Sequence, residues 1–128
     1  MSVIIVDTDI LIDAARQVRE AVDRLDKIEQ NATLAISVIT QMELFVGCRD
    51  KAELRSTERF LQRFQVFNLN DQACKIAVDL VRQYRLSHGL AIPDALIAAT
   101  AVGLNCEFVT KNQQDYGFIS ELRLLSYP

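Results

Sequence analysis

The sequence predicts a three-layer α/β/α fold around a parallel sheet of four to five strands, with residues 1–128 forming a single domain. Val3–Val6 is an unbroken aliphatic run, which is typical of a strand buried on both faces. Further short apolar runs alternate with longer amphipathic segments along the chain. Strands that alternate with helices indicate parallel pairing through helical crossovers. No repeat, linker or low-complexity segment marks a second domain.

In the first half of the chain, apolar residues at three- and four-residue spacing predict helices between short strands. We expect a short helix at residues 10–15, an amphipathic helix at 18–28 and a strand at 34–36. Two helices, at 40–48 and 51–64, and a short strand at 66–67 follow. Helices 40–48 and 51–64 are too charged to be wholly buried although they carry large apolar residues, which predicts a surface groove or dimer face at Leu44, Phe45, Leu54 and Phe60.

In the second half, Asn70 or Asp71 is expected to cap a long helix that Gly89 ends in a left-handed conformation. Pro93 is placed at the first turn of a helix that covers residues 94–104. Residues 107–110 then form a strand, 111–117 a polar loop, and the region near 122–125 the last strand.

Composition restricts the functional classes. The net charge is −3, so phosphate neutralisation by basic side chains alone does not explain nucleic-acid binding, and a divalent cation would be needed. No apolar run approaches the roughly 20 residues of a membrane helix, and no basic segment precedes the first apolar run, so we expect a cytoplasmic protein without membrane contact. The three cysteines match neither a disulfide framework nor a zinc-ligand spacing and are expected to be reduced, small buried residues.

Asp7 ends the first strand, and open α/β sheets bind ligands outside the carboxyl ends of their strands. The alternative is that Asp7 or Asp9 only caps the following helix. Three further acids also have a structural alternative: Glu43 in a capping box with Thr40, Asp94 in a helix first turn, and Asp115 in a capped turn. If the first strand is central, Asp7, Glu43, Asp94 and Asp115 meet at one edge of the sheet. Such a cluster requires cations, and carboxylate oxygens suit Mg²⁺ or Mn²⁺.

Four segments resemble the PIN domain, and most closely the VapC-type toxins of toxin–antitoxin pairs: VDTDILID at 6–13, TQMEL at 40–44, IPDALIAATA at 92–101 and TKNQQDY at 110–116. The resemblance implies a metal-dependent endoribonuclease with Asp7, Glu43, Asp94 and Asp115 as its acidic cluster. Asp7 and Asp94 would be the principal ligands of Mg²⁺ or Mn²⁺.

The resemblance also implies supporting residues and partners. Thr110 and Asn112 would be supporting polar groups, and Asp9 stands where the family often has Asn or Ser. The partners would be an RNA substrate, a second copy in a homodimer, and a VapB-like antitoxin lying across the helices of residues 38–64.

Other chemistries fit less well. A haloacid-dehalogenase-like phosphatase would use Asp7 as the nucleophile and Asp9 as the acid, but its motif requires Gly and then Thr or Val where Ile10 and Leu11 stand. A receiver domain needs an Asp at the end of the third strand, where only Asn68 is available. The single histidine, His88, excludes a two-histidine ribonuclease mechanism.

Overall fold

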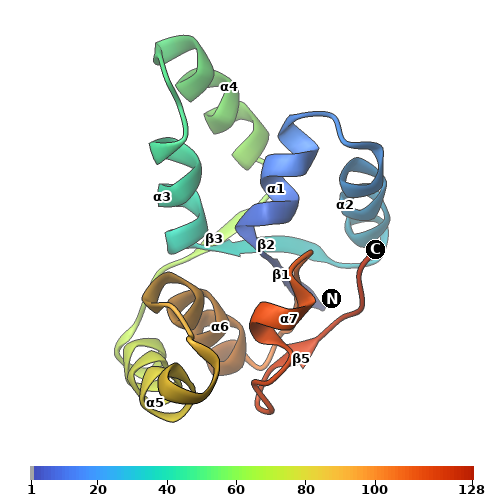
Figure 1. Cartoon of the computed structure of the whole chain (residues 1–128). Helices are drawn as coiled ribbons and strands as arrows, with labels where there is room; N and C mark the ends of the chain where they lie inside the picture. Colours follow the sequence, from blue (N-terminus) through green and yellow to red (C-terminus); the bar gives the residue numbers. More distant parts are fainter. Residues whose placement is uncertain (1) are drawn as a thin grey trace.

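The computed structural model describes residues 2–128 and contains a five-stranded, fully parallel sheet (Figure 1). The strand order is β3-β2-β1-β4-β5, with β1 at the centre between β2 and β4. The strands are β1 (Val3–Val6), β2 (Thr33–Ser37), β3 (Gln65–Phe67), β4 (Glu107–Val109) and β5 (Arg123–Leu124). The predicted fold class is therefore confirmed, with the first aliphatic run as the central strand.

Helices connect the strands and cover both faces of the sheet (Figure 1). They are α1 (Thr8–Ala15), α2 (Arg19–Asn31), α3 (Val38–Val46), α4 (Lys51–Leu61), α5 (Asp71–His88), α6 (Ile92–Leu104) and α7 (Gln113–Tyr116). Their ends follow from local chemistry. The Asn70 side chain accepts from the amide of Ala73 and caps α5, and Gly89 ends that helix at φ +71°, as predicted.

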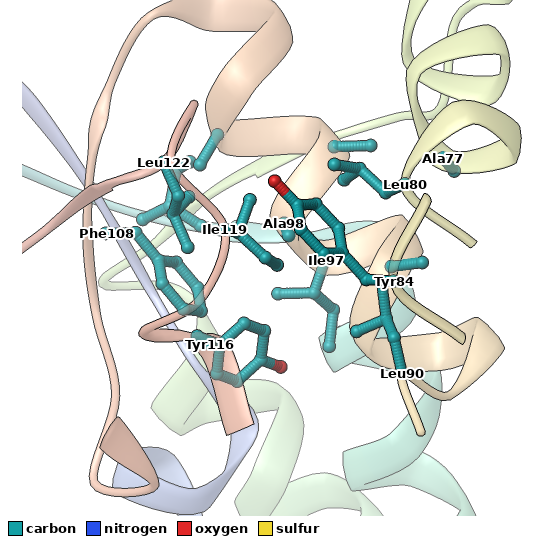
Figure 2. Close-up of a cluster of buried hydrophobic side chains, with 14 of the residues drawn as sticks. Ala77, Leu80, Tyr84, Leu90, Ile97, Ala98, Phe108, Tyr116, Ile119 and Leu122 are labelled. Carbon is teal, nitrogen blue, oxygen red and sulfur yellow. The ribbon is translucent and has the colours of Figure 1, made fainter. Parts of the chain in front are cut away.

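Two apolar cores lie on opposite faces of the sheet because successive strand side chains point to opposite sides. Ile5 and Phe108 point into the core beneath α5 and α6, which Figure 2 shows in close-up. Val6 and Val109, the next residue on each strand, point into the core beneath α1 and α2. All four side chains are fully buried. A register slip of one residue on either strand would turn the side chains of that strand to the opposite face of the sheet, so the strand register is strongly specified.

The strand order reverses beside β1. The chain runs outward from β1 to β2 and β3, then α5 and α6 carry it back so that β4 pairs with the other edge of β1. In open α/β sheets this reversal leaves a crevice at the carboxyl ends of the two strands. Asp7 and Thr110 directly follow β1 and β4, so the topology places both at that crevice.

Several local expectations were wrong. Helices α1 and α3 begin at Thr8 and Val38, two residues earlier than predicted, because Asp7 and Ser37 cap them. The expected polar loop at 111–117 contains the short helix α7. The cysteines are free, as predicted, but Cys74 is exposed and the other two are only half-buried, so they are not small core residues.

Among residues 2–128, no helix combines the length and apolar character that a membrane span requires.

Candidate functional site

Asp7 occupies the centre of the crevice and is only 5% exposed. Its backbone N–H donates to the carbonyl of Val109 at 2.9 Å, which continues the pairing of β1 with β4. Its Oδ1 accepts from the amide of Thr8 at 2.9 Å, and its Oδ2 accepts from the hydroxyl of Thr110 at 2.8 Å. Asp7 therefore caps α1, as the structural alternative proposed, and also presents a buried carboxylate at the sheet edge.

The environment of Asp7 opposes its negative charge. Burial is the largest cause, the charge of Asp9 is the next, and together they raise the pKa of Asp7 from 3.8 to about 7. The hydrogen bonds from Thr110 and Thr8 work in the other direction, and the charge of Asp94 adds to the rise. A buried carboxylate with a raised pKa inside a crevice is a common feature of functional sites.

Asp94 faces the same crevice from α6. It lies in the first turn of that helix, where a carboxylate is favourable, so the structural alternative also describes its position. It is half-buried, and desolvation raises its pKa while a hydrogen bond from Tyr116 opposes the rise. The charges of Asp115, Glu43 and Asp9 raise the pKa of Asp94 further. All four predicted acids and Asp9 are therefore close enough to interact electrostatically.

Glu43 is exposed on α3 and its Oε1 accepts from the hydroxyl of Thr8 at 2.6 Å. The capping-box alternative is wrong, because α3 begins at Val38 and its cap is Ser37, which leaves Thr40 inside the helix. Thr40 is fully buried, and its hydroxyl lies 2.9 Å from that of Thr8. The Thr8 hydroxyl can donate its single proton to either oxygen, that of Glu43 or that of Thr40. The three side chains thus link the start of α1 to α3.

The carboxylate of Asp9 accepts hydrogen bonds from the loop that follows β4. Its Oδ2 accepts from the backbone amide of Asn112 at 3.1 Å and lies 3.2 Å from the hydroxyl of Thr110, and its Oδ1 is 3.4 Å from the amide of Lys111. Asn112 contributes its backbone N–H here, which also donates to the Thr110 hydroxyl at 3.1 Å. The extra acid at position 9 therefore orders the segment that leads to α7, on which Asp115 is exposed.

Two polar residues of the site were not singled out from the sequence. Thr8 holds Glu43, and Tyr116 extends a buried hydroxyl to 3.4 Å from Oδ1 of Asp7. Both stand inside the recognised segments, but no spacing rule distinguishes them from neighbouring residues. The segment of Tyr116 was expected to be a polar loop, whereas it forms the helix α7 with Tyr116 buried.

No cation in the described part of the chain neutralises these acids. The ion pairs found among residues 2–128 join Arg49 to Glu53, Arg63 to Asp26 and Glu29, and Lys111 to Asp13. None involves the four predicted acids. An all-oxygen donor set without its own counter-charge fits a hard divalent cation such as Mg²⁺ or Mn²⁺. No group of three or more Asp, Glu, His or Cys side chains within residues 2–128 is already gathered to hold one ion.

A groove opens beside Glu43 between α1 and the α3–α4 pair. It has a volume of about 590 Å³, and Ile12, Leu44 and Arg49 are among its lining residues. A smaller hollow of about 240 Å³ continues it along α4 towards Phe60 and shares Ala15 with it. The four apolar residues predicted to mark a groove or dimer face are half-buried: Leu44, Phe45, Leu54 and Phe60. Two of them, Leu44 and Phe60, line these hollows.

Comparison with known proteins identifies the fold family. A family model described as PIN domain matches residues 4–118, which is most of the chain. The chain belongs to the PIN-domain family. Ribonuclease VapC10 of Mycobacterium tuberculosis is 36% identical over 121 residues, covering 94% of this chain and 90% of that protein. Ribonuclease VapC19 of the same species is 30% identical over 121 residues, covering 93% and 96%. The phosphatase alternative is not supported, because the matched family is a different one.

Solved structures of toxin–antitoxin proteins superpose over nearly the whole chain. A toxin–antitoxin complex from Klebsiella pneumoniae gives a TM-score of 0.81 at 32% identity and covers 95% of both chains. VapBC2 from Rickettsia felis, bound to a DNA fragment from its promoter, gives 0.84 at 26% identity and covers 98% of this chain and 99% of that chain. The three-layer arrangement deduced for this chain is therefore that of the PIN fold.

Proposed function

We propose that this PIN-domain protein is a cytoplasmic, metal-dependent endoribonuclease and the toxin of a type II toxin–antitoxin pair. The observation that carries the proposal is the buried, uncompensated carboxylate of Asp7 at the switch point, with further acids around it. The known relatives named ribonucleases support the reaction class, and the toxin–antitoxin complexes with the same fold support the biological setting.

Asp7 and Asp94 are the proposed ligands of Mg²⁺ or Mn²⁺. Two carboxylates suffice, because Mg²⁺ commonly keeps several waters and is completed by substrate phosphate oxygens. The bound cation would lower the pKa of a water molecule and stabilise charge on the phosphate. Glu43 and Asp115, which are exposed at the rim, would orient water, and Thr110 donates to Oδ2 of Asp7.

The side chains at the site favour hydrolysis by water over attack by the RNA 2′-hydroxyl. Attack by that hydroxyl needs a base such as histidine, and His88 instead stacks on Phe118, with ring centroids 4.2 Å apart, at the end of α5. Attack by water in line with the departing 3′-oxygen leaves a 3′-hydroxyl and a 5′-phosphate.

End-labelled RNA analysed by mass spectrometry tests the proposal. We expect cleavage to stop with EDTA, to return with Mg²⁺ or Mn²⁺, and to leave 5′-phosphate ends. Asp94→Asn should abolish cleavage without lowering the melting temperature. Asp71→Asn, a matched change in the first turn of α5, should leave cleavage intact. Cyclic 2′,3′-phosphate ends, or cleavage that persists in EDTA, would contradict the mechanism.

The antitoxin is proposed to occupy the groove between α1 and the α3–α4 pair. Apolar side chains of the antitoxin would fill the hollows at Leu44 and Phe60, and a basic side chain would reach the acids past Glu43.

A homodimer is proposed through a separate apolar surface, here called the apolar shelf, which consists of Ile39, Met42, Val46 and Pro93. On this shelf Met42 is 48% and Val46 85% exposed. Co-purification with the product of an adjoining short gene, and light scattering of the free toxin, test these two contacts.

A further inference from the structure

Among residues 2–128, Tyr116 provides the one buried phenol at the acidic crevice. Its side chain is 1% exposed, and its ring packs edge-to-face on Phe108 with centroids 4.9 Å apart. In Figure 2 the ring lies beside Phe108 and its hydroxyl points away from that ring. A buried hydroxyl needs a hydrogen-bond acceptor, because leaving it unpaired costs about 1–3 kcal/mol. The acceptors available to Tyr116 are both carboxylates.

These carboxylates belong to Asp7 and Asp94, which come from different elements. The Tyr116 hydroxyl donates to Oδ1 of Asp7 at 3.4 Å, which is long for an O–H···O bond, and the carboxylate of Asp94 is a second acceptor for the same proton. Asp7 follows β1, Asp94 begins α6 and Tyr116 ends α7. One hydroxyl therefore joins three separate elements at the point where their acids converge.

The position of this hydroxyl is set by packing rather than by the acids themselves. Gln113, at the start of α7, donates from its side chain to the carbonyls of Thr110 and Leu125 at 2.8 and 3.2 Å, which fastens the helix to the chain on either side. The ring of Tyr116 is held against Phe108 on β4. The phenol is therefore a rigidly held donor beside the carboxylates of Asp7 and Asp94.

From this geometry we propose that Tyr116 is a positioning residue that holds the carboxylates of Asp7 and Asp94 in the arrangement that binds a divalent cation. The inference rests on the proposed function. An ionised carboxylate has about four lone-pair positions, and Thr8, Thr110 and Tyr116 together occupy three of those on Asp7. Carboxylates that ligate metals are themselves hydrogen-bonded, and loss of such a partner typically weakens metal affinity or activity 10–100-fold.

The test is isothermal titration calorimetry, in which Mn²⁺ alone is titrated into the 128-residue chain. Tyr116→Phe removes a single oxygen and keeps the ring that packs on Phe108, and we expect it to weaken Mn²⁺ binding about 10–100-fold. Tyr84→Phe is the matched control: this tyrosine is also buried, and its hydroxyl donates to Glu121 at 3.0 Å, outside the acidic cluster. It should bind Mn²⁺ as the unaltered protein does.

A second variant separates positioning from packing. Phe108→Leu loosens the contact that holds the ring but keeps the Tyr116 hydroxyl, so it should also weaken Mn²⁺ binding, by a smaller factor than Tyr116→Phe does. RNA cleavage by Tyr116→Phe should fall at limiting Mn²⁺ and largely recover when Mn²⁺ saturates the site. Unchanged or tighter Mn²⁺ binding by Tyr116→Phe would overturn the inference.

Asp94→Asn distinguishes failure of this inference from failure of the proposed function. If Asp94→Asn loses Mn²⁺ binding while Tyr116→Phe retains it, only the role of Tyr116 is wrong. If Asp94→Asn binds Mn²⁺ as the unaltered protein does, the metal site itself is misplaced and both proposals fall.

Discussion

The pKa of Asp7 makes the stability of the metal-free protein depend on pH in a predictable direction. The carboxyl binds its proton more tightly in the folded state, where the pKa is about 7, than in the unfolded chain, where it is near 3.8. Its contribution to stability is therefore complete below pH 3.8 and is lost as the pH rises through 7. At 1.36 kcal/mol for each pH unit, the loss by pH 8 is about 4 kcal/mol.

Asp7→Asn removes this penalty and keeps the local hydrogen bonds. The amide oxygen still caps the Thr8 N–H, and the amide nitrogen donates to the Thr110 hydroxyl, whose proton then turns to Asp9 at 3.2 Å. In EDTA at pH 8 the variant should be more stable than the unaltered protein by up to about 4 kcal/mol. For a chain of this size the melting temperature rises on the order of 10 °C. The two proteins should converge near pH 4.

Thermal melts from pH 4 to pH 8, with EDTA and with saturating Mg²⁺, measure the effect. Mg²⁺ should raise the melting temperature of the unaltered protein and leave that of Asp7→Asn unchanged, because ligand binding to the folded state stabilises it. RNA cleavage by Asp7→Asn should be absent. If Asp7→Asn were less stable than the unaltered protein at pH 8 in EDTA, the carboxylate would be a structural cap and the electrostatic reasoning would be refuted.

Three further predictions follow from neighbouring contacts. Asp9→Asn should reduce the fall in stability between pH 4 and pH 8, measured by the same melts, because the charge of Asp9 is the second cause of the raised pKa of Asp7; an unchanged fall would contradict this cause. Thr8→Val should lower RNA cleavage about tenfold by freeing Glu43, and Thr8→Ser should restore it, with melts of both variants as the control for folding. Val46→Glu should convert the proposed homodimer to a monomer in light scattering, and a dimer that persists would exclude the shelf as its interface.

The sequence by itself determined the architecture. The Val3–Val6 run predicted a strand buried on both faces, and Ile5 and Val6 are fully buried in it. Gly89 and Pro93 marked the end of α5 and the start of α6, since only particular residue types suit a left-handed cap and a helical first turn. Such signals are local, so they are readable without knowledge of the partner elements.

Only the tertiary structure decided which side chains the acids contact and how burial shifts the pKa of Asp7. A capping box at Thr40 was consistent with the local sequence, but the buried Ser37 caps α3 and Glu43 turns to Thr8, 35 positions earlier in the chain. The raised pKa of Asp7 depends on burial and on the charge of Asp9, and the link from Tyr116 to Asp7 spans 109 positions. No local pattern encodes contacts between residues so far apart in the chain, because they exist only after β1 and β4 pair and α7 packs across their ends.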